Sequence, residues 1–205
     1  VNAVAVEGLS TTIGAATEYV FRGVSLGDAG AYASVDYEVA GFYAGVWAID
    51  DGSAGNNGME TDFYFGYGVD LDGIELGIGY SRYEYTYVSS FEQEINLSAA
   101  FSGVGLDIAI GNKDDGADSN ADETDYTVIE LSYGAGPYGV KLGAFDQDTG
   151  DNGNTFAEEE YMWFEVSYSA EVGTFDVTAT VGQQFGYEVA GMDVSSEGRN
   201  YMVFD

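Results

Sequence analysis

The chain has 205 residues and a formal net charge of −31, with 36 acidic residues against 5 basic ones. So few cations exclude a nucleic-acid partner, because phosphate neutralisation requires Lys and Arg. The sequence contains no cysteine and no histidine. This excludes a disulfide framework, most zinc and iron–sulfur sites, and every Ser-His or Cys-His nucleophile. We expect no enzyme.

The chain is nevertheless too apolar for a disordered acidic tail, since 45% of it is hydrophobic and 15% is aromatic. It has no apolar run of about 18 residues, so the sequence predicts no transmembrane helix. The start, Val1-Asn2-Ala3, is typical of a mature terminus left by signal cleavage. We expect one domain over 1–205, with 1–10 as a periplasmic N-terminal segment.

Residues that alternate between apolar and polar dominate the sequence, as in β-strands with two different faces. The clearest case is 62–71, where every odd-numbered residue from Phe63 to Leu71 is apolar. Most segments have 9–12 residues, which suits a tilted strand that crosses a bilayer. Twelve such segments are predicted, at 11–22, 31–40, 42–50, 61–71, 73–86, 91–102, 104–112, 125–134, 137–146, 160–170, 173–185 and 199–205.

The connections between these segments are alternately short and long. The short ones contain glycine and suit tight hairpin turns; they lie at 40–41, 71–73, 102–103, 134–136 and 171–173. The long ones are polar and acidic, at 23–30, 50–60, 86–91, 112–124, 146–159 and 186–198. This sorting indicates a membrane barrel with short periplasmic turns and longer acidic outer loops.

The two faces of the strands differ in a way that a soluble barrel does not explain. About twelve strands make a barrel too wide for side chains to fill. An apolar interior would therefore leave a large dry void. Aromatic residues near the strand ends suit girdles at the two membrane interfaces: Tyr19, Phe21, Phe63, Tyr80, Phe101, Tyr133, Phe164 and Tyr168. The predicted fold is an all-β, antiparallel, up-and-down transmembrane β-barrel of about 12 strands in a bacterial outer membrane.

The polar face would then line the lumen. Its charged members are predicted to be Glu18, Arg22, Asp36, Glu38, Asp70, Glu75, Glu94, Asp107, Glu130, Lys141, Glu165, Asp176 and Arg199. Carboxylates outnumber cations there, and an acidic channel favours cations over anions. The alternative is that these charges pair with the few cations and plug a lumen that conducts nothing.

One outer loop has the composition of a calcium site. Asp146, Asp148 and Asp151 space carboxylates around glycines, as hard cations require. The alternative is an ordinary solvated loop, which such composition usually forms.

The N-terminal part carries a family resemblance. Residues 18–25 resemble the Y-x-F-R-G-x-S element of the TorF family, whose members are regarded as porins and were first catalogued as conserved bacterial proteins of unknown function. Asp36-Tyr37, residues 41–47 and Glu60-Thr61-Asp62 match its next elements, and Arg22 and Trp47 occupy characteristic positions. The match covers about the first 80 residues, and it implies an outer-membrane barrel with a transport role.

Three functions remain open at this stage. The first is an outer-membrane, porin-like channel for passive diffusion of small solutes, preferring cations. The second is a structural or interaction barrel with a plugged lumen and calcium-binding outer loops. The third is a soluble, secreted acidic β-protein that assembles through strand edges.

The expected partners are outer-membrane lipid, lipopolysaccharide and small solutes or cations, and the chain could also form homo-oligomers. The last segment is short, so either the natural chain runs further or the closing strand is unusual.

Overall fold

The computed structural model describes residues 7–50, 58–86, 90–114, 124–148, 159–189, 192–193 and 199–205. No helix in these ranges is long and apolar enough to cross a membrane. The strands are β1 (Leu9–Ala16), β2 (Tyr19–Phe21), β3 (Val24–Gly27), β4 (Gly30–Val39), β5 (Phe42–Asp50), β6 (Met59–Leu71), β7 (Ile74–Tyr85), β8 (Phe91–Phe101), β9 (Val104–Asp114), β10 (Thr124–Ala135), β11 (Tyr138–Asp148), β12 (Glu159–Val172), β13 (Phe175–Val189), β14 (Met192–Asp193) and β15 (Asn200–Phe204).

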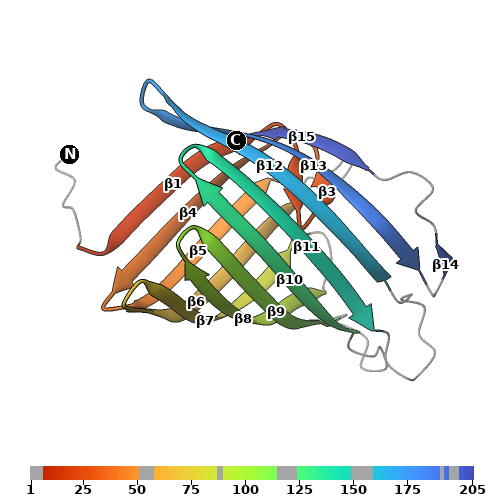
Figure 1. The fold of residues 1–205 in the computed structure, drawn as a ribbon, viewed down its shortest axis with the longest axis horizontal. Helices are drawn as coiled ribbons and strands as arrows, with labels where there is room; N and C mark the ends of the chain where they lie inside the picture. The colour runs from red at the N-terminus through yellow and green to blue at the C-terminus, as the bar shows by residue number, and fades with distance from the viewer. Residues whose placement is uncertain are drawn as a thin grey trace.

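Most of these strands form one antiparallel sheet that curls into a barrel (Figure 1). Its order is β1, then β4 to β13 in sequence, with β15 paired to β13. The two-residue β14 adds only a short pairing to the end of β13. The wall therefore contains twelve strands, as predicted, and sequential neighbours lie side by side.

The barrel is nearly closed where its first and last strands meet. The Thr17 amide donates to the Phe204 carbonyl at 3.0 Å, and the Phe204 amide donates to Thr17 Oγ1 at 3.0 Å. Within the described residues, β1 itself pairs only with β4. β15 therefore meets the chain just beyond the end of β1 and not along its length.

The apolar side of the wall faces outward. Large apolar side chains are exposed along every long strand; examples are Val46, Phe65, Ile78, Leu97, Ile110, Leu131, Leu142, Val166 and Val181. A soluble monomer rarely exposes so continuous an apolar surface, whereas a bilayer requires it. Outward aromatic pairs mark the short-turn end, with Phe42 and Tyr67 rings 4.7 Å apart and Tyr138 and Tyr168 rings 5.3 Å apart.

The short turns follow a common rule. Residues Ala40-Gly41, Asp72-Gly73 and Ser102-Gly103 each take positive φ at both positions. That is the geometry of a type I′ turn, whose twist matches the flanking strands. The predicted glycine-marked hairpins are therefore confirmed at this end of the barrel.

One prediction about the wall is wrong. The segment 11–22 was expected to be a single crossing strand, but β1 ends at Ala16 and the chain then turns inward. Tyr19 and Phe21 are consequently not interface aromatics. Tyr19 is only 8% exposed, and Phe21 packs against Tyr83 with ring centroids 5.8 Å apart.

Candidate functional site: a hairpin inside the barrel

The inward segment is a small hairpin made of β2 and β3. These strands form a separate two-stranded sheet that pairs with no wall strand. Its turn is Arg22-Gly23, with φ of 50° and 78°. Both positive values again indicate a type I′ turn, so the hairpin tip has the same backbone conformation as the short turns of the wall.

Arg22 reaches from this tip to a buried carboxylate on β8. Its Nη2 lies 2.9 Å from Glu94 Oε1, and the two side chains are 11% and 1% exposed. Tyr83 Oη donates to the same oxygen at 2.7 Å, and Tyr126 Oη donates to Glu94 Oε2 at 3.0 Å. A buried carboxylate is tolerated when several donors satisfy it. Glu94 therefore joins the hairpin to β7, β8 and β10.

Tyr19, the first residue of β2, forms a second attachment. Its Oη donates to Glu60 Oε1 at 2.9 Å, and Glu60 is 2% exposed. The Tyr19 ring also lies 5.9 Å from that of Trp47, which in turn lies 6.0 Å from Tyr32. The characteristic residues of the N-terminal motif, Arg22 and Trp47, thus both serve to hold the hairpin in the lumen.

The hairpin tip rests on Trp163 of β12, which is completely buried. A Cβ at Gly23 would come within 2.4 Å of the Trp163 Cβ, and a Cβ at Gly143 would come within 2.0 Å of Trp163 Cζ2. Only glycine leaves room for the indole at both positions. Trp163 belongs to a cluster of buried residues with Ala109, Tyr126, Val128 and Tyr161, against which Val24 of β3 packs.

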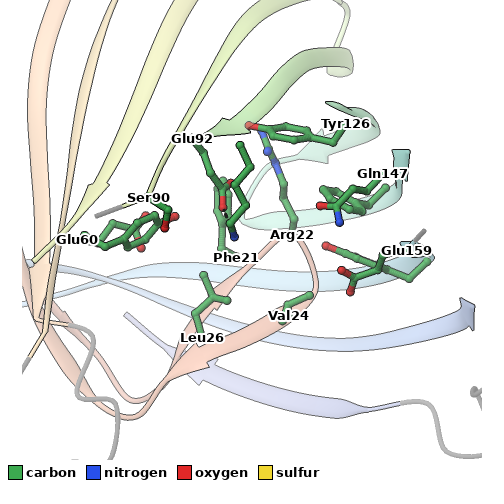
Figure 2. A pocket seen from close by; sticks show the side chains of 14 residues that line it. Phe21, Arg22, Val24, Leu26, Glu60, Ser90, Glu92, Tyr126, Gln147 and Glu159 are labelled. Atoms are coloured by element: carbon green, nitrogen blue, oxygen red, sulfur yellow. Dashed lines mark hydrogen bonds and ion pairs between the residues drawn. The ribbon is translucent and has the colours of Figure 1, made fainter. Parts of the chain in front are cut away.

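The hairpin separates two described cavities. On the long-loop side, a cavity of about 360 Å³ is lined by hairpin and wall residues. In Figure 2 the Arg22 side chain extends from the hairpin toward the Tyr126 ring, with Glu92 nearby. On the short-turn side, a cavity of about 420 Å³ contains no hairpin residue and shares no residue with the first. We call them the outer and inner vestibules.

The two vestibules differ in charge. The outer vestibule is lined by Arg22, Lys113, Glu60, Glu92 and Glu159 among others, and Lys113 Nζ lies 3.0 Å from Glu92 Oε1. The charged lining of the inner vestibule consists of carboxylates alone: Glu38, Asp70, Glu75 and Asp107. Between the hairpin and this end, Lys141 Nζ lies 3.0 Å from Glu130 Oε1 and 3.9 Å from Glu165 Oε2.

The structure places most of the predicted lumen residues on the inner face. Asp36 accepts hydrogen bonds from Ser34 and Tyr64, and Glu165 accepts one from Tyr201 at 2.8 Å. The register puts further acidic pairs side by side: Asp70 with Glu75, Asp107 with Glu130, and Asp176 with Glu171. Glu18 lies at the start of the inward segment, and Arg199 is an exposed residue just before β15.

The predicted calcium loop is only partly described. Asp146 and Asp148 lie at the C-terminal end of β11 and are both exposed. Asp151 lies outside the described residues. Within the described ranges, no group of three acidic side chains is arranged to hold a metal ion. Calcium binding therefore stays a prediction.

Sequence reasoning missed the residues that receive the hairpin: Tyr83, Tyr126, Trp163 and Glu60. Their alternation places them on the inner face, but nothing in a linear pattern pairs them with a hairpin from the other side of the barrel. The available signal was the Arg22-Gly23 pair, which has the X-Gly form of the short wall turns.

Solved structures with the same fold are outer-membrane porins. A BenF-like porin from Pseudomonas fluorescens matches with a TM-score of 0.53 at 9% identity, over 98% of this chain and 64% of that one. OprD from Pseudomonas aeruginosa matches with 0.52 at 10%, over 97% and 64%. OccK2 from the same organism, solved with glucuronate, matches with 0.53 at 12%, over 98% and 68%.

These porins are longer proteins, since this chain spans 64% of the length of the BenF-like porin and of OprD. At such low identity the likeness shows the porin-like barrel fold alone.

No curated protein matches the sequence. A family model described as "Bacterial protein of unknown function (Gcw_chp)" matches residues 2–201. The description agrees with the expected family of bacterial proteins of unknown function. It does not contain the name TorF. The chain belongs to this Gcw_chp family.

Proposed function

We propose that the protein is an outer-membrane, porin-like channel for passive diffusion of small solutes, and that it prefers cations. The observation that carries the proposal is the inner vestibule, where four carboxylates and no cation make up the charged lining. In a confined space bounded by a low-dielectric wall, such a surplus attracts cations and repels anions. The porin-like fold and the outward apolar belt support the membrane location.

The pairing of the basic residues supports the same preference. Lys141 lies between Glu130 and Glu165, Lys113 lies beside Glu92, and Arg22 lies against Glu94. These three basic residues are therefore each neutralised locally by a carboxylate, whereas no basic residue lines the inner vestibule. OccK2 was solved with glucuronate, an acid, whereas this lining favours a neutral or positively charged solute.

The test is a reversal potential in planar bilayers that separate two KCl concentrations. We expect the purified full chain to give a potential of the sign set by K⁺. Replacing Glu38, Asp70, Glu75 and Asp107 together by their amides should shift it toward zero. The matched control replaces four carboxylates of the outward rim, Glu84, Asp146, Asp148 and Glu160, and should leave it unchanged. An anion-directed potential in the native protein would overturn the proposal.

A second candidate function is a barrel that conducts nothing and acts through its outer loops. The hairpin favours it, because Glu94, Glu60 and Trp163 are almost completely buried at its level. Lipopolysaccharide, calcium and a second copy of the chain remain predicted partners of those loops. Absence of any conductance, even after the hairpin is removed, would favour this candidate.

A further inference from the structure

We propose that the β2–β3 hairpin is a movable plug, and that the Arg22–Glu94 ion pair is the latch that holds it across the lumen. The proposal rests on the channel function proposed above, because a plug matters only where a solute passes. It assigns to the N-terminal motif a regulatory role in that channel.

The first argument is that the hairpin closes the barrel at one level. From Tyr19 to its tip it touches residues of β5, β6, β7, β8, β10 and β12. Inner-face residues at that level are buried, among them Trp163 and Glu94, whereas Glu38 and Asp70 near the short turns are exposed. The lumen is therefore packed at the hairpin and open beneath it.

The second argument is that the hairpin is not part of the wall. Its two strands pair only with each other, and its described contacts with the wall are made by side chains and by the glycine at its tip. A lone two-stranded hairpin is marginally stable, so its inward position depends on a few attachments. The antiparallel pairings of the wall strands are made without either hairpin strand, so none of them has to break when the hairpin moves.

The third argument concerns the carboxylate left behind. If Arg22 withdraws, Glu94 still accepts hydrogen bonds from Tyr83 and Tyr126, so the wall side of the latch remains satisfied. The positive charge leaves the narrowest level while the negative charge stays. Opening would therefore widen the lumen and strengthen its preference for cations in one step.

The space for this movement lies on the long-loop side. Residues 17–18 join the hairpin to β1 and residues 28–29 join it to β4, and both connections lie at that end. The outer vestibule is lined on its hairpin side by Phe21, Arg22, Val24 and Leu26 (Figure 2). A hairpin pivoting about its two connections would move into this cavity.

The experiment measures single-channel conductance of the full chain in planar bilayers. Arg22→Glu places like charges at the latch, and we expect conductance to rise severalfold together with cation preference. The charge swap, Arg22→Glu with Glu94→Arg, should restore values near the native ones. Arg82→Ala is the matched control, because Arg82 is paired with Glu84 outside the lumen; it should change neither quantity. Native conductance in Arg22→Glu would overturn the latch.

A cross-link separates movement of the hairpin from loss of one side chain's volume. The chain has no cysteine, so Phe21→Cys with Tyr83→Cys offers one pair of thiols at neighbouring positions, where the native rings are 5.8 Å apart. In the Arg22→Glu background, a short thiol cross-linker should lower conductance to that of the same double-cysteine protein with native Arg22, and cleaving the linker should raise it again. Conductance that stays high after cross-linking would overturn the movement.

A hairpin deletion separates failure of the plug from failure of the channel. Residues 19–27 are replaced by a short Gly-Ser linker, and folding is checked by the β-sheet circular dichroism signal in detergent. A folded variant that conducts more than the native chain supports both proposals. Equal conductance in the two proteins overturns the plug and leaves the channel. A folded variant that conducts nothing overturns the channel itself.

Discussion

At the scale of single residues, the interior of this barrel depends on glycines that make room for aromatic rings. Trp163 is fully buried between the backbone of Gly143 on the adjacent strand and Gly23 at the hairpin tip. Tyr126, Phe145 and Tyr161 continue the packing, with ring centroids 5.7 Å and 4.9 Å apart. A rigid wall of large rings leaves little freedom to absorb an added atom.

Gly143→Ala is therefore expected to destabilise the barrel. The new Cβ would meet Trp163 Cζ2 at 2.0 Å, and overpacking of this kind costs about 1–3 kcal/mol. The free energy of unfolding in urea, measured in lipid vesicles, gives the value, and Trp fluorescence reports displacement of the indole. Gly134→Ala is the control, since nothing lies within 4 Å of its added Cβ. Equal stability of the two variants would contradict this account of Trp163.

At the scale of elements, the wall could be predicted from the sequence and the inward hairpin could not. Period-2 alternation, glycine-marked turns and alternating loop lengths are local signals, and they located all twelve wall strands, although the first was expected to run on to residue 22. β2 continues the alternation of β1, with Tyr19 and Phe21 in the apolar phase, so the linear pattern cannot show that the chain has turned inward. The partners of the hairpin, such as Glu60 and Glu94, lie 41 and 72 residues away from it.

The turns make a prediction about stability. Ala40 holds a left-handed conformation with φ of 51°, which costs an ordinary L-residue about 1–2 kcal/mol. Asn tolerates this region better than Ala. Ala40→Asn should therefore stabilise the barrel by about 0.5–1 kcal/mol in vesicle unfolding experiments.

Asp72→Asn serves as the comparison for that change. Asp72 has φ of 54° in the equivalent turn, and Asp already tolerates the left-handed region. Its replacement by Asn should leave the unfolding free energy nearly unchanged. A destabilised Ala40→Asn barrel would show that the side chain at position 40 has another role.

At the scale of the whole molecule, the barrel exposes a continuous belt of apolar side chains on its outer surface and places carboxylates of the strand interiors on its inner face. Acidic residues can accumulate on the inner face because paired cations and tyrosine hydroxyls satisfy the buried ones, while an open vestibule hydrates the others. The same arrangement makes the outer face intolerant of charge in a membrane. Neighbouring residues on one strand should therefore respond in opposite ways to the same substitution.

Leu97 and Ser98 of β8 provide that comparison. Leu97 faces outward between Ile78 and Ile108, and Ser98 faces the inner vestibule between Gly77 and Asp107. Leu97→Lys should lower the unfolding free energy in lipid vesicles by about 2–4 kcal/mol, the range for a lysine near the bilayer midplane. Ser98→Lys should be much less destabilising, because its ammonium group can lie beside Asp107, and it should reduce the proposed preference for cations. If Leu97→Lys were tolerated in vesicles and Ser98→Lys were not, the apolar face would not be the one that meets lipid.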